Sequence, residues 1–138
     1  MDRTMLVVDD EEPILFALNY YFSPRGFRVD CAREIEEAEA LLANGHYSIV
    51  IADLRLTGIH GAEGLEIVSY VRERAADTKV ILLTAYGTPE IERLAYERGA
   101  DAFLQKPQRL PAIARLVETL MAGDAVSSGV DTDRMSDK

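Results

Sequence analysis

The feature that most restricts the fold of this chain is a repeated alternation of short apolar runs with longer amphipathic segments. The apolar runs occupy residues 4–8, 48–52, 79–83 and 102–104, and residues 27–31 predict a weaker strand. Runs that are apolar on both faces are typical of strands in a covered parallel sheet. The amphipathic segments predict a helix between residues 9–13 and 23–26, and others at about 34–43, 65–71, 89–98 and 109–121. Together these segments predict an α/β fold, a doubly wound five-stranded parallel sheet with helices on both faces.

Composition and net charge restrict the classes of function that this chain can have. The chain has 138 residues, of which 48% are hydrophobic and 28% charged, as expected for one globular domain. Its net charge of −9 argues against binding to nucleic acid or to an anionic membrane surface. Because Cys31 is the one cysteine in the sequence, the chain can form neither an intrachain disulfide nor a cysteine-based metal cluster.

The sequence also predicts where the protein is located and how far its folded domain extends. No stretch approaches the roughly 20 apolar residues that span a bilayer, and none resembles a signal peptide, so we expect a cytoplasmic protein. Residues 123–138 are rich in Ser, Gly and Asp and have almost nothing to bury. We therefore predict one folded domain over residues 1–122, followed by a flexible tail or a linker.

Polar side chains follow four of the predicted strands at the point where each strand ends. They are Asp9 and Asp10, Asp53, Thr84 and Lys106. Because the carboxyl ends of parallel strands meet at one edge of a sheet, we expect these side chains to converge on one crevice. A cluster of carboxylates suits a hard divalent cation, and a lysine and a hydroxyl beside it can orient a phosphoryl group.

Four sequence motifs resemble the receiver domain of two-component response regulators. They are Leu-Val-Val-Asp-Asp-Glu at 6–11, Ile-Ala-Asp-Leu-Arg at 51–55, Leu-Thr-Ala at 83–85 and Gly-Ala-Asp-Ala-Phe-Leu-Gln-Lys-Pro at 99–107. The resemblance covers residues 4–121, and the combined spacing is specific although each short motif alone is not. It implies a flavodoxin-like sheet with strand order 2-1-3-4-5.

The resemblance also implies roles for individual residues. Asp53 would accept a phosphoryl group from a histidine kinase or a histidine phosphotransfer protein. Asp9, Asp10, Asp53 and the backbone carbonyl of Arg55 would hold Mg²⁺. Lys106 would pair with Asp53 and then with a phosphoryl oxygen. Such a domain catalyses its own phosphorylation and slow dephosphorylation but is otherwise not an enzyme.

Other residues are assigned to the switch that follows. The resemblance implies that Thr84 turns its hydroxyl onto the phosphoryl group and that Phe103 turns inward. This movement would reshape the face of the fourth helix, fifth strand and fifth helix for a downstream protein or a homodimer. Arg55 and Tyr86 each lie two residues beyond a site residue, where they could shield the phosphoryl group from water. The Lys106–Pro107 bond is a candidate cis peptide.

Three departures from the family pattern concern the loop after Asp53 and the switch position. Thr57 stands where the family often has proline, and residues 58–63 form a longer loop than usual. Phe103 replaces the tyrosine often found at the switch position and lacks its hydroxyl. His60 lies in this loop and is more simply a solvated residue than a phosphoryl relay.

Two other functions remain open at this point. An aspartate-nucleophile phosphatase uses similar groups but places a second acid two residues after its nucleophile, where this chain has Arg55. A phosphorylation-independent interaction module would leave the acidic set unused. A stable label from a small phosphodonor favours the receiver, turnover favours the phosphatase, and no label favours the module.

Overall fold

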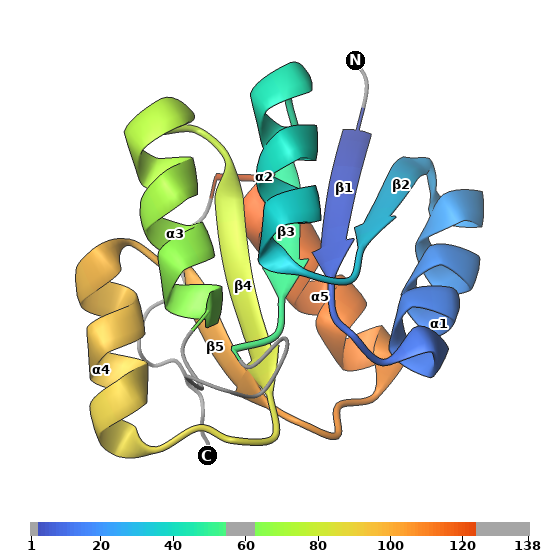
Figure 1. The fold of residues 1–138 in the computed structure, drawn as a ribbon. Coiled ribbons are helices and arrows are strands. Elements are labelled where there is room, and N and C mark those ends of the chain that lie inside the picture. The colour runs from blue at the N-terminus through green and yellow to red at the C-terminus, as the bar shows by residue number, and fades with distance from the viewer. Residues whose placement is uncertain (1–2, 55–62, 124–138) are drawn as a thin grey trace.

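A computed structural model describes residues 3–54 and 63–123 as a parallel sheet flanked by helices (Figure 1). The strands are β1 (Arg3–Val8), β2 (Phe27–Ala32), β3 (Ile49–Ala52), β4 (Lys79–Thr84) and β5 (Ala102–Gln105). Their order in the sheet is β2-β1-β3-β4-β5, and each neighbouring pair is parallel. The predicted fold class and strand order are therefore confirmed.

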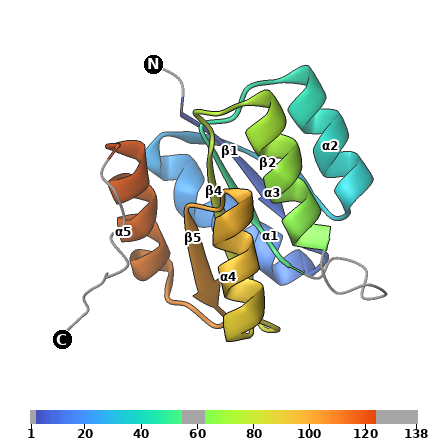
Figure 2. The same cartoon turned by 90° about the vertical axis from the view of Figure 1, so that its left-hand side faces the viewer.

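In the described part of the chain, five α-helices cover the sheet. They are α1 (Glu12–Phe22), α2 (Ile35–Asn44), α3 (Glu63–Arg74), α4 (Pro89–Arg98) and α5 (Leu110–Met121). One face of the sheet packs against α1 and α5, and the other against α2, α3 and α4 (Figure 2). Among the described residues, none of these helices is long and apolar enough to cross a membrane.

Successive strand residues alternate between the two faces of the sheet, so both faces have an apolar core. Val7, Ile51 and Ile81 pack with α1 and α5. Val8 and Leu82, one position further along their strands, pack with the helices on the opposite face. This double coverage explains why the inner strands β1, β3 and β4 appear in the sequence as nearly continuous apolar runs, whereas the edge strand β2 does not.

Local sequence signals set both ends of α4. Thr88 is the N-cap of α4, and its hydroxyl accepts a hydrogen bond from the backbone N–H of Ile91 (3.1 Å). Gly99 ends the same helix in the left-handed conformation, with φ of 114°, which glycine adopts without steric cost. After α1, however, the chain continues as the 3₁₀ turn η1 (Ser23–Arg25) rather than stopping at once. The predicted tail at 123–138 lies outside the described residues apart from Gly123.

Candidate functional site

The hydrogen-bond ladder of the sheet continues one residue beyond three of its strands, and this positions the candidate site. The backbone N–H of Asp9 donates to the carbonyl of Ala32 (3.0 Å), and that of Asp53 to the carbonyl of Val8 (2.9 Å). The N–H of Lys106 donates to the carbonyl of Thr84 (2.8 Å). The three side chains therefore leave the carboxyl edge of the sheet from fixed backbone positions, as the strand ends predict.

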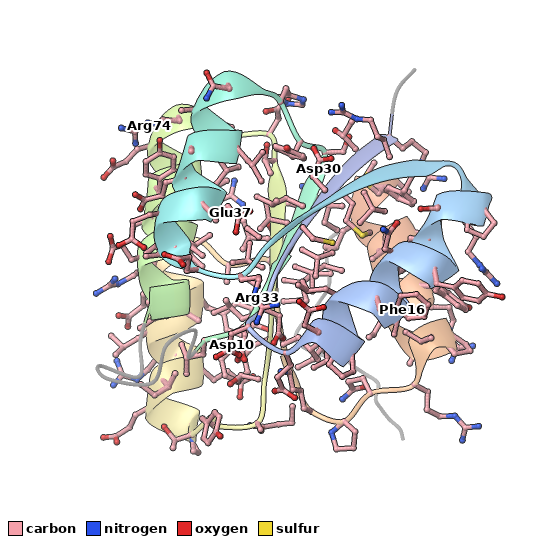
Figure 3. All side chains as sticks on the ribbon, turned by 45° about the vertical axis from the view of Figure 1, so that its right-hand side comes forward. Asp10, Phe16, Asp30, Arg33, Glu37 and Arg74 are labelled. Atoms are coloured by element: carbon pink, nitrogen blue, oxygen red, sulfur yellow. The ribbon has the colours of Figure 1, made fainter. Side chains whose placement is uncertain are left out.

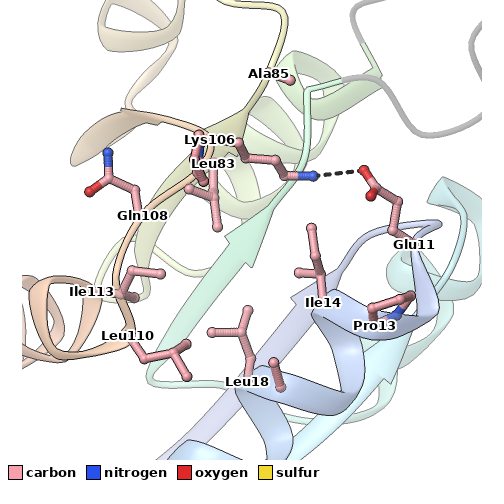
Figure 4. A pocket seen from close by; sticks show the side chains of 12 residues that line it. Glu11, Pro13, Ile14, Leu18, Leu83, Ala85, Lys106, Gln108, Leu110 and Ile113 are labelled. Carbon is pink, nitrogen blue, oxygen red and sulfur yellow. Dashed lines mark hydrogen bonds and ion pairs between the residues drawn. The ribbon is translucent and has the colours of Figure 1, made fainter.

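Lys106 lies at the centre of the site and is surrounded by carboxylates. Its Nζ donates to Asp9 Oδ2 (2.9 Å), Asp53 Oδ2 (3.2 Å) and Glu11 Oε2 (3.2 Å), the last drawn in Figure 4. The side chains of Asp9 and Asp53 are each only 3% exposed and that of Lys106 is 12% exposed, whereas that of Glu11 is 58% exposed. One partly buried ammonium group thus pairs with two buried carboxylates and an exposed one, and negative charge remains in excess.

Burial and pairing shift two pKa values at this site. Burial raises the pKa of Asp9 above its ordinary value, although hydrogen bonds from Lys106 and from the backbone N–H of Glu11 oppose the shift. For Lys106, burial alone would lower the pKa. The hydrogen bond and charge of Asp9, together with the charge of Asp53, outweigh burial and raise the pKa of Lys106. Lys106 is therefore a permanent cation at neutral pH.

The acidic residues at this edge are close enough together to share a cation. One carboxylate oxygen from each of Asp9, Asp10, Glu11 and Asp53 lies within 4.8 Å of the others. Asp10 is exposed, and its backbone carbonyl accepts a hydrogen bond from Arg33 (3.5 Å; both residues are labelled in Figure 3). Carboxylate oxygens are the ligands that hard divalent cations prefer, so this donor set fits such an ion.

Glu11 is the site residue that the sequence analysis did not identify. It stands at the N-cap of α1, where a negative charge interacts favourably with the helix dipole, so its presence there does not by itself indicate a site. Its backbone N–H donates to Asp9 Oδ1 (2.9 Å) while its carboxylate contacts Lys106. The signal available in the sequence was its position directly after Asp9 and Asp10, on the same loop.

Thr84 and Phe103 are both buried beside the site. Thr84 has no exposed surface, and its hydroxyl accepts a hydrogen bond from the backbone N–H of Tyr86 (3.0 Å). Phe103 is only 8% exposed, and a Cβ added to Gly87 would lie 2.6 Å from its ring. The ring is therefore already packed inward under the loop that follows β4, the position that the family resemblance implies for it after phosphorylation.

Some of the remaining predicted residues lie within the described part of the chain, and others lie outside it. Tyr86 is 54% exposed on the loop after Thr84, and the Lys106–Pro107 peptide bond is cis. Arg55, with its expected backbone ligand, lies outside the described residues, as do Thr57, His60 and most of the 58–63 loop.

Comparison with protein-family models gives one match. The model of the response regulator receiver domain matches residues 5–118, which include β2 to β5, most of β1 and most of α5.

Individual relatives agree with that match. The photosynthetic apparatus regulatory protein RegA of Cereibacter sphaeroides is 35% identical over 106 residues, covering 77% of this chain and 56% of that protein. The response regulator protein PilR of Pseudomonas aeruginosa is 34% identical over 116 residues, covering 84% of this chain and 25% of that protein. The chain therefore spans about half the length of its relatives, or less.

Solved structures show the same architecture. A response regulator from Burkholderia pseudomallei, solved with a phosphorylated aspartic acid, calcium ion and citrate, superposes with a TM-score of 0.78 at 26% identity, covering 88% of this chain and 70% of that one. A CheY-like receiver domain protein from Methanospirillum hungatei gives a TM-score of 0.83, covering 94% and 100%. At 22% identity, the second supports the fold alone.

Proposed function

Because this chain belongs to the receiver-domain family of two-component response regulators, we propose that Asp53 is its phosphoacceptor and that Asp9, Asp10 and Lys106 serve that reaction. Receiver domains are signalling domains, and the phosphatase and the phosphorylation-independent module are not favoured. The observation that carries the proposal is the position of the Lys106 ammonium between two buried carboxylates, Asp9 and Asp53.

The chemistry assigned to Asp53 is a phosphoryl transfer. One carboxylate oxygen attacks phosphorus of a phosphohistidine and forms a C–O–P bond. The P–N bond breaks, and its electron pair stays on the ring nitrogen, so neutral imidazole leaves when the other ring nitrogen carries a proton. Aspartyl phosphates of this kind are known covalent intermediates.

The chain's own residues stabilise the charge that develops. Lys106 is a fixed cation 3.2 Å from Asp53 and pairs with an oxygen of the transferred group. Thr84, on the neighbouring strand, turns its hydroxyl from the N–H of Tyr86 to another phosphoryl oxygen. A divalent cation, which we propose to be Mg²⁺, supplies charge neutralisation when Asp9, Asp10 and Asp53 hold it. The Burkholderia pseudomallei structure pairs a phosphorylated aspartate with a divalent ion, calcium, which supports this assignment.

The output is a change in the populations of two surface conformations. Movement of Thr84 and closer packing of Phe103 reshape the face formed by α4, β5 and α5, where a downstream protein or a second copy binds.

The phosphoryl donor is a histidine kinase or a histidine phosphotransfer protein, and the protein works in the cytoplasm. Arg55 and Tyr86 shield the acyl phosphate, so Tyr86→Ala is expected to shorten its measured half-life.

Labelling with a small acyl phosphate in the presence of Mg²⁺, followed by mass spectrometry, tests the proposal. We expect stoichiometric label on Asp53, loss of label in Asp53→Asn, and unchanged label in Asp77→Asn, which removes an exposed carboxylate elsewhere. Chelation of Mg²⁺ is expected to stop labelling. Label on Asp9 or Asp10 would contradict the assignment. Rapid turnover of the donor would support the phosphatase, and absence of label the interaction module.

A further inference from the structure

Glu11 differs from the other carboxylates that contact Lys106. Asp9 and Asp53 are buried, and each follows a strand whose ladder fixes its backbone. Glu11 lies on the loop before α1, and its side chain reaches Lys106 from the solvent side with 58% of its surface exposed. Exposed ion pairs contribute little to stability, whereas buried ones are costly to break. The contact with Glu11 is therefore the one that Lys106 can give up most easily.

The Glu11–Lys106 pair lies at the edge of a mainly apolar cavity. Glu11 and Lys106 also line a cavity of about 530 Å³ between α1 and α5, which is otherwise lined mainly by apolar side chains such as Ile14, Leu18 and Leu110 (Figure 4). Within that lining, Glu11 and Lys106 are the two charged residues. An apolar wall weakens the screening of a neighbouring charge, so the carboxylate of Glu11 acts on the acceptor site more strongly than a fully solvated acid.

A phosphoryl donor enters this site as an anion. It must approach Asp53 against the charges of Asp9, Asp10 and Asp53 itself, which the acceptor chemistry requires. Glu11 adds a further negative charge, since one of its carboxylate oxygens lies within 4.8 Å of an oxygen of each of these aspartates. It also holds one of the hydrogen bonds that the ammonium of Lys106 can donate. Phosphoryl oxygens that pair with Lys106 therefore compete with Glu11.

We propose that Glu11 is an exchangeable counter-ion of Lys106, which the incoming phosphoryl group displaces and whose charge slows phosphorylation by strongly anionic donors. Glu11 thus acts as a positioning residue that discriminates among donors by their charge. This inference rests on the proposed role of Asp53 as acceptor.

The test compares wild type with Glu11→Gln, which keeps the size of the side chain and removes its charge. Initial rates of Asp53 labelling are measured at saturating Mg²⁺ with acetyl phosphate and with phosphoramidate, which carries less net negative charge. With acetyl phosphate at low ionic strength, we expect the variant to react about three- to tenfold faster, as one unit charge a few ångströms from a dianion implies. The gain should be smaller with phosphoramidate and should shrink as salt shortens the screening length from about 30 Å to about 3 Å.

Two further variants make the comparison specific. Glu11→Asp keeps the charge and is expected to retain the salt dependence of wild type. Asp77→Asn removes one charge from the α3–β4 loop, where Asp77 pairs with His46 (3.5 Å), and is expected to leave the rates unchanged. A Glu11→Gln variant that reacts no faster than wild type, or whose gain ignores salt and donor charge, overturns the inference. Absence of any label on wild type overturns the proposed function as well.

Discussion

Two ion-pair clusters occupy opposite ends of the sheet and differ in how their charges balance. At the carboxyl ends of the strands, Lys106 faces the carboxylates of Asp9, Glu11 and Asp53. At the amino ends of β4 and β5, Arg72 faces the single carboxylate of Asp101 (2.8 Å). The first cluster has an excess of negative charge, and the second is neutral.

The two clusters also differ in how completely their donors are used. The guanidinium of Arg72 donates to three backbone carbonyls, those of Ala76 (2.8 Å), Thr78 (2.6 Å) and Gly99 (2.9 Å), besides Asp101. Asp101 also accepts from the backbone N–H of Val80 (2.8 Å). This network joins α3, β4 and the end of α4 through groups that need not move. A balanced cluster stabilises the fold, whereas the unbalanced one at Lys106 is the one to which we assign the cation and the phosphoryl group under the proposed function.

The largest expected effect comes from breaking the balanced cluster. Arg72→Met leaves Asp101 without its cation and three carbonyls without a donor, so we expect the free energy of unfolding to fall by about 3 kcal/mol. Urea denaturation measures this change. Arg93→Met is the matched control, because Arg93 forms an exposed pair with Glu97 within α4, and it should cost no more than about 0.5 kcal/mol. Equal losses in both variants would refute the comparison.

Mg²⁺ is expected to stabilise the unbalanced cluster next most strongly. At ten times its Kd, preferential binding to the native state raises the free energy of unfolding by about 1.4 kcal/mol. Thermal unfolding with and without Mg²⁺ measures the increment, which should be much smaller in Asp10→Asn. In Arg72→Met the increment should stay the same, because distant sites act independently. An increment that Asp10→Asn leaves intact would place the cation elsewhere.

Replacing an aspartate by asparagine should change the free energy of unfolding in opposite directions in the two clusters. Asp53→Asn removes one of the crowded charges while Lys106 keeps Asp9 and Glu11, so we expect the metal-free protein to gain about 1 kcal/mol. Asp101→Asn removes the carboxylate that pairs with Arg72 and should lower the free energy of unfolding. Chemical denaturation without metal gives both values. A loss of stability in Asp53→Asn would show that the carboxylates at Lys106 are not crowded.

The smallest expected effect is a pH dependence at Asp9. Its folded pKa is raised above the ordinary value of 3.8, so the stability that it contributes is complete below that pH and is lost as pH rises through the folded pKa. The hydrogen bond from Lys106 opposes the shift and keeps the effect small. Wild type should therefore lose stability relative to Asp9→Asn as pH rises from below 3.8 in metal-free buffer. Parallel curves for the two proteins would contradict the raised pKa.

The sequence predicts those features that depend on local pattern. Apolar runs place β1, β3, β4 and β5, and Gly99 marks the end of α4, because burial and left-handed backbone both leave a local signal. The convergence of Asp9, Asp53 and Lys106 also follows once the strands are taken as parallel. The strand order does not follow in this way, since several orders cover the same apolar faces, and it came from the family resemblance.

Features that depend on how separate elements pack are not visible in the sequence. Arg72 and Asp101 are 29 residues apart, and a flexible arginine on an amphipathic helix gives no indication of its partner. The inward ring of Phe103 depends on the missing side chain at Gly87, which the sequence presents only as a loop glycine. The reach of Glu11 to Lys106 likewise depends on the placement of β5 beside β4.

The position of Lys106 after the last strand links the site to the order in which the chain is made. Lys106 is 97 residues from Asp9 and 53 residues from Asp53, and it follows β5, the edge strand that pairs with β4. A ribosome therefore delivers the carboxylates first and their ammonium partner last. A nascent chain that ends before β5 has the acidic residues without the cation that holds them together. Docking of β5 onto β4 therefore brings Lys106 to the carboxylates, so the ion pairs of this site form only once the last strand is in place.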